Sequence, residues 1–154
     1  MANILNIIFS IFGSICVYVI GQLLSKFFIE PVYELRKTFG EVRFILAFHA
    51  PTIHTLINRS KERSNAANEA LHKSSCDLIA NLQAIPYYEK IRCLPIGTLP
   101  PRKNVECAAI QLRGLSTYVY KEGDKANASI DIINKRVEKI ESLLCLIPLE
   151  SVKC

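Results

Sequence analysis

The sequence predicts an all-α protein, with an N-terminal transmembrane helix followed by a small cytoplasmic helical bundle of about four to five helices. Two observations support this fold class. Ile4–Leu24 is a run of 21 residues without a charge. Beyond it, apolar residues recur every three or four positions in segments bounded by prolines or polar stretches, as in helices with one buried face. We therefore assign residues 1–29 to a transmembrane anchor and 30–154 to one cytoplasmic helical domain.

The uncharged run has the length needed to cross a bilayer. At about 1.5 Å per residue, it forms a helix of roughly 30 Å, the thickness of the hydrocarbon core. A cleaved signal peptide would have a basic start and a shorter apolar region of about 7 to 15 residues. Here the first basic residue is Lys26, and bulky residues occupy the place of cleavage. A buried helix of a soluble protein is disfavoured, because a chain of 154 residues could not cover it on all sides.

The charges that flank the run predict its orientation. Lys26, Arg36, Lys37 and Arg43 follow it, whereas no Lys or Arg precedes it. By the positive-inside bias, the amino terminus lies outside and the remainder in the cytoplasm, as expected of a single-pass protein of the inner (plasma) membrane. The six cysteines form no CxxC pair, which suits a reducing compartment. The net charge of +5 is explained by anionic lipid headgroups, and no nucleic acid is expected as a partner.

One side of the anchor carries small and weakly polar side chains at helical spacing. Such residues let two helix backbones approach closely in lipid. We therefore predict a homo-oligomer that pairs through this face, although Ser and Gly are also simply tolerated in membrane spans. The predicted helix-association face consists of Ser10, Gly13, Ser14, Val17, Gly21 and Ser25.

An elbow is predicted at Glu30 and Pro31, just beyond the anchor. Proline disfavours helix in the residue before it and is accepted in a first helical turn, so the anchor should end or kink there and a second helix begin. The stretch 42–57 is too short and too polar for a second span, since it contains Arg43 and Pro51. A re-entrant or interfacial segment is the alternative for this stretch.

The remaining chain predicts three further helices and their connections. Residues 58–68 form a polar turn, and residues 86–104 form a proline-rich loop with a short helical turn. The last helix has the cleanest three-and-four alternation, which lasts under three heptads and therefore indicates packing within the domain. The predicted buried positions of the three helices are Ala67, Leu71, Leu78, Leu82 and Ile85; Val105, Ala108, Leu112, Leu115 and Val119; Ile130, Ile133, Val137, Ile140, Leu144 and Ile147.

The residues that could carry chemistry form no recognisable site. His49 and His54 are separated by a proline, and His72 stands alone, so no metal site is predicted. Cys76 and Cys107 lack the local signature of a nucleophile. We therefore expect no catalytic, cofactor-binding or metal-binding residues, and no enzyme.

The sequence favours a non-enzymatic, membrane-anchored helical module. It would self-associate through the anchor and bind an unidentified protein partner at the cytoplasmic face, where Tyr87 and Tyr88 in the proline-rich loop form a candidate partner surface. The alternative is a small membrane-acting effector, pore-forming or depolarising, of a bacterial defence or toxin system. A lone, mostly apolar span offers few polar residues to line a water path, which argues against the alternative.

Three passages carry a resemblance: KFFIEPVYELRKTFGEV directly after the span, then NLQAIPYYEKI, then AAIQLRGLS. They resemble a group of small single-span bacterial membrane proteins with an IEP-x-x-ELR segment and no assigned activity. The resemblance extends from Gly21 to Ser116 and implies structural positions in elbows and helix crossings. These positions are Glu30, Pro31, Arg36, Gly40, Pro86, Tyr88, Gly114 and Ser116.

Overall fold

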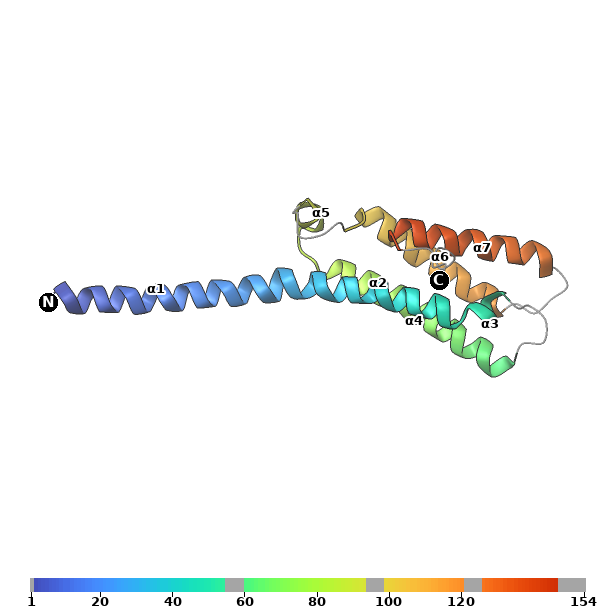
Figure 1. Ribbon diagram of the computed structural model, residues 1–154, viewed down its shortest axis with the longest axis horizontal. Coiled ribbons are helices and arrows are strands. Elements are labelled where there is room, and N and C mark those ends of the chain that lie inside the picture. Colours follow the sequence, from blue (N-terminus) through green and yellow to red (C-terminus); the bar gives the residue numbers. More distant parts are fainter. Residues whose placement is uncertain (1, 55–59, 94–98, 121–125, 147–154) are drawn as a thin grey trace, which may run out of the picture.

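The computed structural model describes residues 2–54, 60–93, 99–120 and 126–146, and these residues form helices and no strand (Figure 1). This confirms the all-α fold class, while the division into two domains stays a prediction. In chain order the elements are α1 (Ala2–Leu24), the π-helical turn η1 (Ser25–Ile29), α2 (Glu30–Phe48), α3 (Ala50–His54), α4 (Lys61–Gln83), α5 (Tyr88–Arg92), α6 (Arg102–Tyr120) and α7 (Ala126–Leu143).

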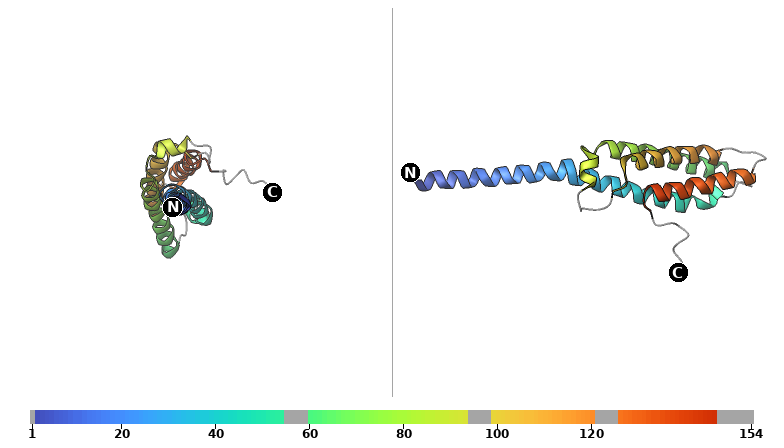
Figure 2. Two further views of the ribbon diagram at one scale, coloured as in Figure 1. Left: turned by 90° about the vertical axis from the view of Figure 1, so that its left-hand side faces the viewer. Right: turned by 90° about the horizontal axis from the view of Figure 1, so that it is seen from above.

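The first three elements form one continuous rod with a shallow change of direction near η1, and the other helices lie along its α2 half (Figures 1 and 2). Among the described residues, one helical segment, Phe9–Phe48, is long and apolar enough to cross a membrane, and its apolar part is not covered by any other element. Phe9, Phe12 and Tyr18 of α1 are all exposed. The predicted apolar anchor is therefore a helix that projects beyond the rest of the molecule.

The chain stays helical through the predicted elbow at Glu30 and Pro31. As expected, a helix begins at Glu30 with Pro31 in its first turn, and the rod changes direction only slightly near η1 (Figure 1). A proline ring clashes with the carbonyl four residues earlier, and a wider π-helical turn relieves such a clash. In η1 the Glu30 N–H donates to Ser25 O, and both Ile29 and Glu30 keep helical backbone angles. The irregularity is thus absorbed by one wide turn, and the rod continues without a break in its helical backbone.

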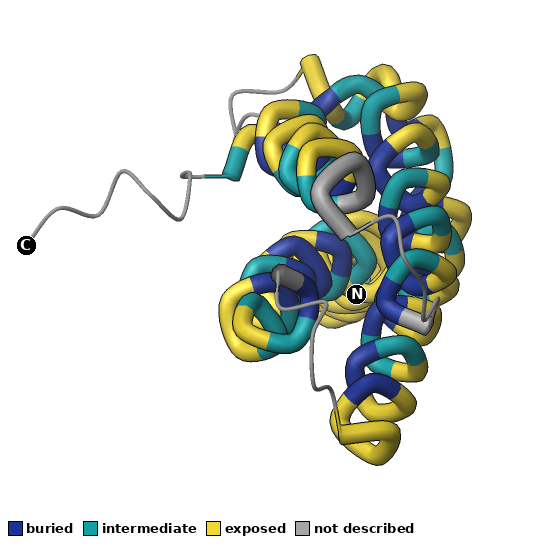
Figure 3. Tube along the Cα trace, turned by 90° about the vertical axis from the view of Figure 1, so that its right-hand side faces the viewer, coloured by how far each residue is buried: buried dark blue, intermediate teal, exposed yellow. Residues whose placement is uncertain are grey.

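Beside the rod, α2, α4, α6 and α7 pack around a common apolar core. α4 contacts both α2 and α6, and α6 also contacts α7, which lies on the same side of the bundle as α2 (Figure 2). Figure 3 shows the buried residues of these helices facing one another and their exposed residues facing outward. The predicted faces supply much of this core. Its largest fully buried side chains are Leu35, Val42, Leu46, Ile53, Leu71, Leu78, Leu82, Val105, Leu112, Leu115, Ile133 and Ile140.

Small side chains and two hydrogen bonds fix α4 against its neighbours. Ser75 Oγ donates to Ala109 O of α6 at 2.8 Å, and both residues are buried. On the other side, Asn81 Nδ2 donates to Thr38 Oγ1 of α2 at 2.7 Å, while the Thr38 hydroxyl donates to Glu34 O. A buried hydroxyl costs free energy unless it is hydrogen-bonded, so these pairs favour one register of the helices.

Two stretches differ from the sequence prediction or extend it. The predicted polar turn 58–68 is wrong from Lys61 onward, because α4 already begins there. Its small residues Ser64 and Ala67 are buried, so packing of this turn outweighs the local preference of Ser and Asn for loops. In the stretch 42–57, α3 follows the end of α2 and contacts α4 and α7, and Ile53 is buried. Residues 55–57 lie outside the described part.

Gly114 lets an arginine of α7 lie against α6. Arg136 Nη1 donates to Gln111 Oε1 at 2.8 Å, and the guanidinium lies 5.3 Å from the ring centroid of Tyr118. A Cβ atom on Gly114 would overlap Arg136 Nη1 and lie 2.9 Å from its Cζ. The sequence suggested a close crossing here, and the structure shows that the close neighbour is a side chain.

We expect Gly114→Ala to destabilise the protein by about 1 kcal/mol. The methyl group displaces the guanidinium and its charge-assisted hydrogen bond, worth roughly 1.5–3 kcal/mol, while better helix propensity returns about 1 kcal/mol. In an Arg136→Ala background the same substitution should instead stabilise. Urea unfolding of the four variants in mild detergent measures both signs, and stabilisation by Gly114→Ala in both backgrounds would contradict this packing.

Candidate functional site: the exposed faces of the rod

The predicted helix-association face lies on one side of α1 and is exposed over its whole length. Among the described residues, nothing lies within 4 Å of a Cβ atom added to Gly13 or Gly21, so the helix backbone is accessible at both points. Ser14 Oγ donates to Ser10 O at 2.9 Å, which satisfies its hydroxyl within the helix as an apolar surrounding requires. A second helix could therefore approach this face closely, and its role in pairing stays a prediction.

The side of α2 that faces away from α4 is also uncovered and carries aromatic residues. Tyr33, Phe44 and Phe48 are 65%, 64% and 66% exposed. The rings of Phe44 and Phe48 stack at 5.6 Å between centroids. Gly40 lies between them and Tyr33 along the helix, and nothing lies within 4 Å of a Cβ atom added to it. Tyr33, Phe44 and Phe48 together form an exposed aromatic surface on α2.

His49 ends α2 beside this surface. Its ring packs edge-on against Phe48, 5.0 Å between centroids, and partial burial lowers its pKa below the usual value. A lowered pKa favours the neutral imidazole near pH 7, so His49 extends the aromatic surface without adding charge.

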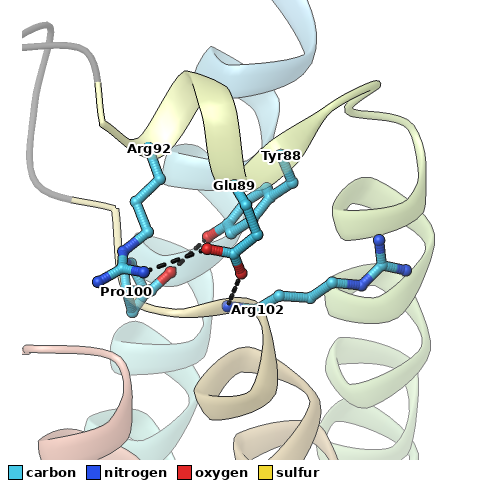
Figure 4. Close-up of polar contacts among 5 residues, drawn as sticks. All are labelled: Tyr88, Glu89, Arg92, Pro100 and Arg102. Carbon is cyan, nitrogen blue, oxygen red and sulfur yellow. Dashed lines mark hydrogen bonds and ion pairs between the residues drawn. The ribbon is translucent and has the colours of Figure 1, made fainter.

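The two adjacent tyrosines of the candidate partner surface differ in their exposure to solvent. Tyr87, which adopts a left-handed backbone conformation with φ 52, is 72% exposed, whereas Tyr88 is 3% exposed. The Tyr88 hydroxyl donates to Pro100 O at 2.7 Å (Figure 4). The prediction that both residues face a partner is thus wrong for Tyr88, because its side chain is buried in the core and its hydroxyl is hydrogen-bonded to the loop. Tyr87 alone presents its ring, with Lys90 Nζ 5.3 Å from the ring centroid.

Glu89 connects the two ends of this loop. One carboxylate oxygen accepts the Arg102 backbone N–H at 3.3 Å, at the start of α6, and the other lies 3.1 Å from Arg92 Nη1 (Figure 4). A carboxylate at the amino end of a helix is favoured by the helix dipole. The hollow lined by Tyr87, Glu89, Lys90 and Arg102 is open to the surface, and the Arg102 guanidinium beside it pairs with Glu106 of its own helix.

The Tyr88 contact predicts a pH dependence at the alkaline end. Burial, with a smaller contribution from Glu89, raises the pKa of Tyr88 to about 12 from 10.0. A raised folded-state pKa means that this stabilisation is complete below pH 10 and is lost as the pH rises toward about 12. Tyr88→Phe should lower stability by about 1 kcal/mol at neutral pH, because the hydrogen bond is lost, and should reduce the further loss between pH 10 and 12.

Urea midpoints at pH 8 and pH 11 test this prediction, with Tyr87→Phe as the matched control. The control should follow the wild-type pH dependence, since Tyr87 is exposed. An equal alkaline loss in wild type and Tyr88→Phe would contradict the assignment.

The residues that could carry chemistry are spread over single helix surfaces. Cys76 Sγ lies 3.9 Å from His72 Nδ1, one turn away on the exposed side of α4, with no enclosed pocket beside it. Cys107 is also exposed and has no histidine in contact among the described residues. Across the described ranges, no group of three metal-ligating side chains comes together. Nucleophilic catalysis needs a base and an anion-stabilising pocket around the thiol, and neither candidate has this arrangement.

The comparisons with known proteins add no family to this geometry. A scan against protein-family models gives no match, and searches of curated proteins and of solved structures find no similar chain. The resemblance to single-span bacterial membrane proteins therefore stays a prediction, and function is argued from the exposed faces alone.

Proposed function

We propose that this chain is a single-pass, non-enzymatic membrane protein that self-associates through α1 and presents a cytoplasmic helical bundle to a protein partner. The observation that carries the proposal is the uncovered apolar surface of α1, which continues through η1 into the packed helix α2. In water, an apolar surface of this extent is unfavourable at about 25 cal/mol per Å². Lipid removes that cost without requiring another protein domain to cover it.

The charge distribution supports the orientation. Lys26 follows α1 directly, and Arg36, Lys37 and Arg43 lie on α2. Cytoplasmic segments next to a span carry such an excess of basic residues, and anionic lipid headgroups attract Lys26 at the membrane surface. The packed helices then lie in the cytoplasm, where their exposed cysteines stay reduced.

The open side of α1 supports self-association. Gly13 and Gly21 are two helical turns apart on the predicted face, so a second helix can approach the backbone at both points. We expect Gly21→Leu to lower the yield of crosslinked dimer in membranes about fivefold, on the scale of roughly 1 kcal/mol. Gly13→Leu should act in the same direction.

Val19→Leu is the matched control, because Val19 lies on the opposite side of the same helix. Chemical crosslinking in isolated membranes at equal expression levels compares the variants. A chain that remains monomeric in wild-type form, or dimers that survive Gly21→Leu and Gly13→Leu unchanged, would overturn the self-association part of the proposal.

A further inference from the structure

The aromatic surface on α2 lies too far from the bilayer to be explained by lipid. Phe44 follows the end of α1 by 20 residues, which is about 30 Å along a straight helix. Because α2 continues α1 with only a shallow bend (Figure 1), an α1 that crosses the membrane carries Phe44 and Phe48 away from the headgroups. Exposed aromatic rings in such a position are typical of a protein interface.

The wide turn η1 determines how the faces of α1 and α2 are aligned. An α-helix repeats its face about every 3.6 residues. Continued at that spacing from Gly21, the predicted helix-association face would reach Leu35, Phe39 and Val42. These three side chains are buried against the neighbouring helices. A uniform α-helix would therefore point the face of α1 into the protein's own core.

The π-helical turn changes this alignment by one residue. Its hydrogen bonds run from residue i+5 to residue i, so the turn contains one residue more than the α-helical turn that it replaces. The face of α1 then continues through Tyr33, Gly40, Phe44 and Ala47, all of which are exposed. The predicted helix-association face of α1 and the side of α2 without neighbours therefore form one uninterrupted strip along the rod.

From this alignment we propose that a second copy of this chain pairs along the whole strip, parallel and in register, so that the interface extends from α1 through η1 onto α2. The inference rests on the proposed self-association through α1 and adds its cytoplasmic half. The strip on α2 has spacings of seven, four and three residues, between Tyr33, Gly40, Phe44 and Ala47. Lys37 divides the first spacing into four and three, which completes the three-and-four spacing of a two-stranded coiled coil. Symmetric pairing places each of these residues opposite its own copy.

The charges beside the strip match a parallel pair. Arg36 and Glu41 flank the seam on opposite sides, five residues apart, which are the positions that form ion pairs between the strands of a parallel coiled coil. Each Arg36 therefore meets Glu41 of the second copy. Lys37 falls within the seam and lies 3.6 Å from Glu34 of its own helix. A lysine in the seam is tolerated at some cost in stability and favours one register.

Disulfide crosslinking in membranes tests this pairing. The native cysteines are replaced by alanine in the full-length chain, and single cysteines are introduced by Val17→Cys in α1, Gly40→Cys and Ala47→Cys in α2, and Arg113→Cys in α6 as an exposed control. A disulfide requires Cα atoms within about 7 Å, so only residues opposite their own copy react efficiently. We expect several-fold more dimer from Val17→Cys, Gly40→Cys and Ala47→Cys than from Arg113→Cys.

Each pattern of crosslinks leads to a distinct conclusion. Dimer from Val17→Cys alone, with both α2 positions at the level of the control, would overturn the extended interface and leave the pairing of α1 intact. No dimer above control at any position would overturn the self-association and the inference together. Dimer from α2 alone would contradict a continuous strip.

Charge reversal gives a second readout in the Gly40→Cys chain. Arg36→Glu and Glu41→Arg should each lower the dimer yield, and the double variant should restore it. A double variant that is as weak as the single variants would contradict the ion pair between copies.

Discussion

Leu112→Ala should destabilise the packed helices by about 3 kcal/mol, because it opens a cavity where α6 meets its neighbours. Leu112 is fully buried near the middle of α6, the helix that contacts both α4 and α7. Truncation of a buried leucine costs the lost apolar transfer energy together with the cavity, roughly 2–5 kcal/mol in all. Such a loss is a large fraction of the stability of a small domain.

Ile110→Ala provides the matched control on the same helix. Ile110 is 65% exposed, so its truncation should change stability by less than about 0.5 kcal/mol. Urea unfolding of both variants in mild detergent, followed by circular dichroism, compares them. Equal urea midpoints for the two variants would contradict the burial of Leu112 in the core.

Ile11→Arg together with Ile15→Arg should release the chain from the membrane. Residues 4–24 contain 13 Ile, Leu, Phe and Val side chains, which favour insertion by about 0.3–0.6 kcal/mol each, or roughly 4–8 kcal/mol together. Each arginine near the centre of a span costs about 2.5–3.5 kcal/mol on the same scale. The double substitution therefore cancels most of the insertion free energy, whereas one arginine alone should leave a partly inserted population.

The control replaces the same two residues by leucine, which keeps the length and hydropathy of the span. Membrane and soluble fractions are compared after cell disruption, with total expression measured in parallel. Retention of the double arginine variant in the membrane to the same extent as the leucine control would show that something other than α1 holds the chain there.

Regular helices with strong periodicity were predictable from this sequence, and the irregular turns between them were not. Every predicted buried position of α4 and α6 is buried, since apolar residues at three-and-four spacing have few other ways to leave water. The wide turn η1 was missed, because a proline pattern alone does not distinguish a bent helix from a straight one with a π-helical turn. That turn decides which face of α2 continues the face of α1.

The loop around Tyr87 and Tyr88 shows a second limit. Two adjacent tyrosines in a proline-rich loop look equivalent in the sequence, and no periodicity says which one is buried. The left-handed conformation of Tyr87 and the acceptor at Pro100 make the difference, and both depend on how the loop closes onto α6. The sequence contains no residue spacing typical of a catalytic or metal site. The candidate site is therefore defined by the exposure of side chains and not by a motif.

Extraction of isolated membranes with alkaline carbonate is the most direct test of the central claim, that α1 crosses a lipid bilayer. Carbonate removes proteins that are held by surface charge or by other proteins, whereas a helix of this length and hydropathy stays in the hydrocarbon core. We predict that the full-length chain stays with the membrane pellet after extraction. Its quantitative release as a soluble protein would contradict the account.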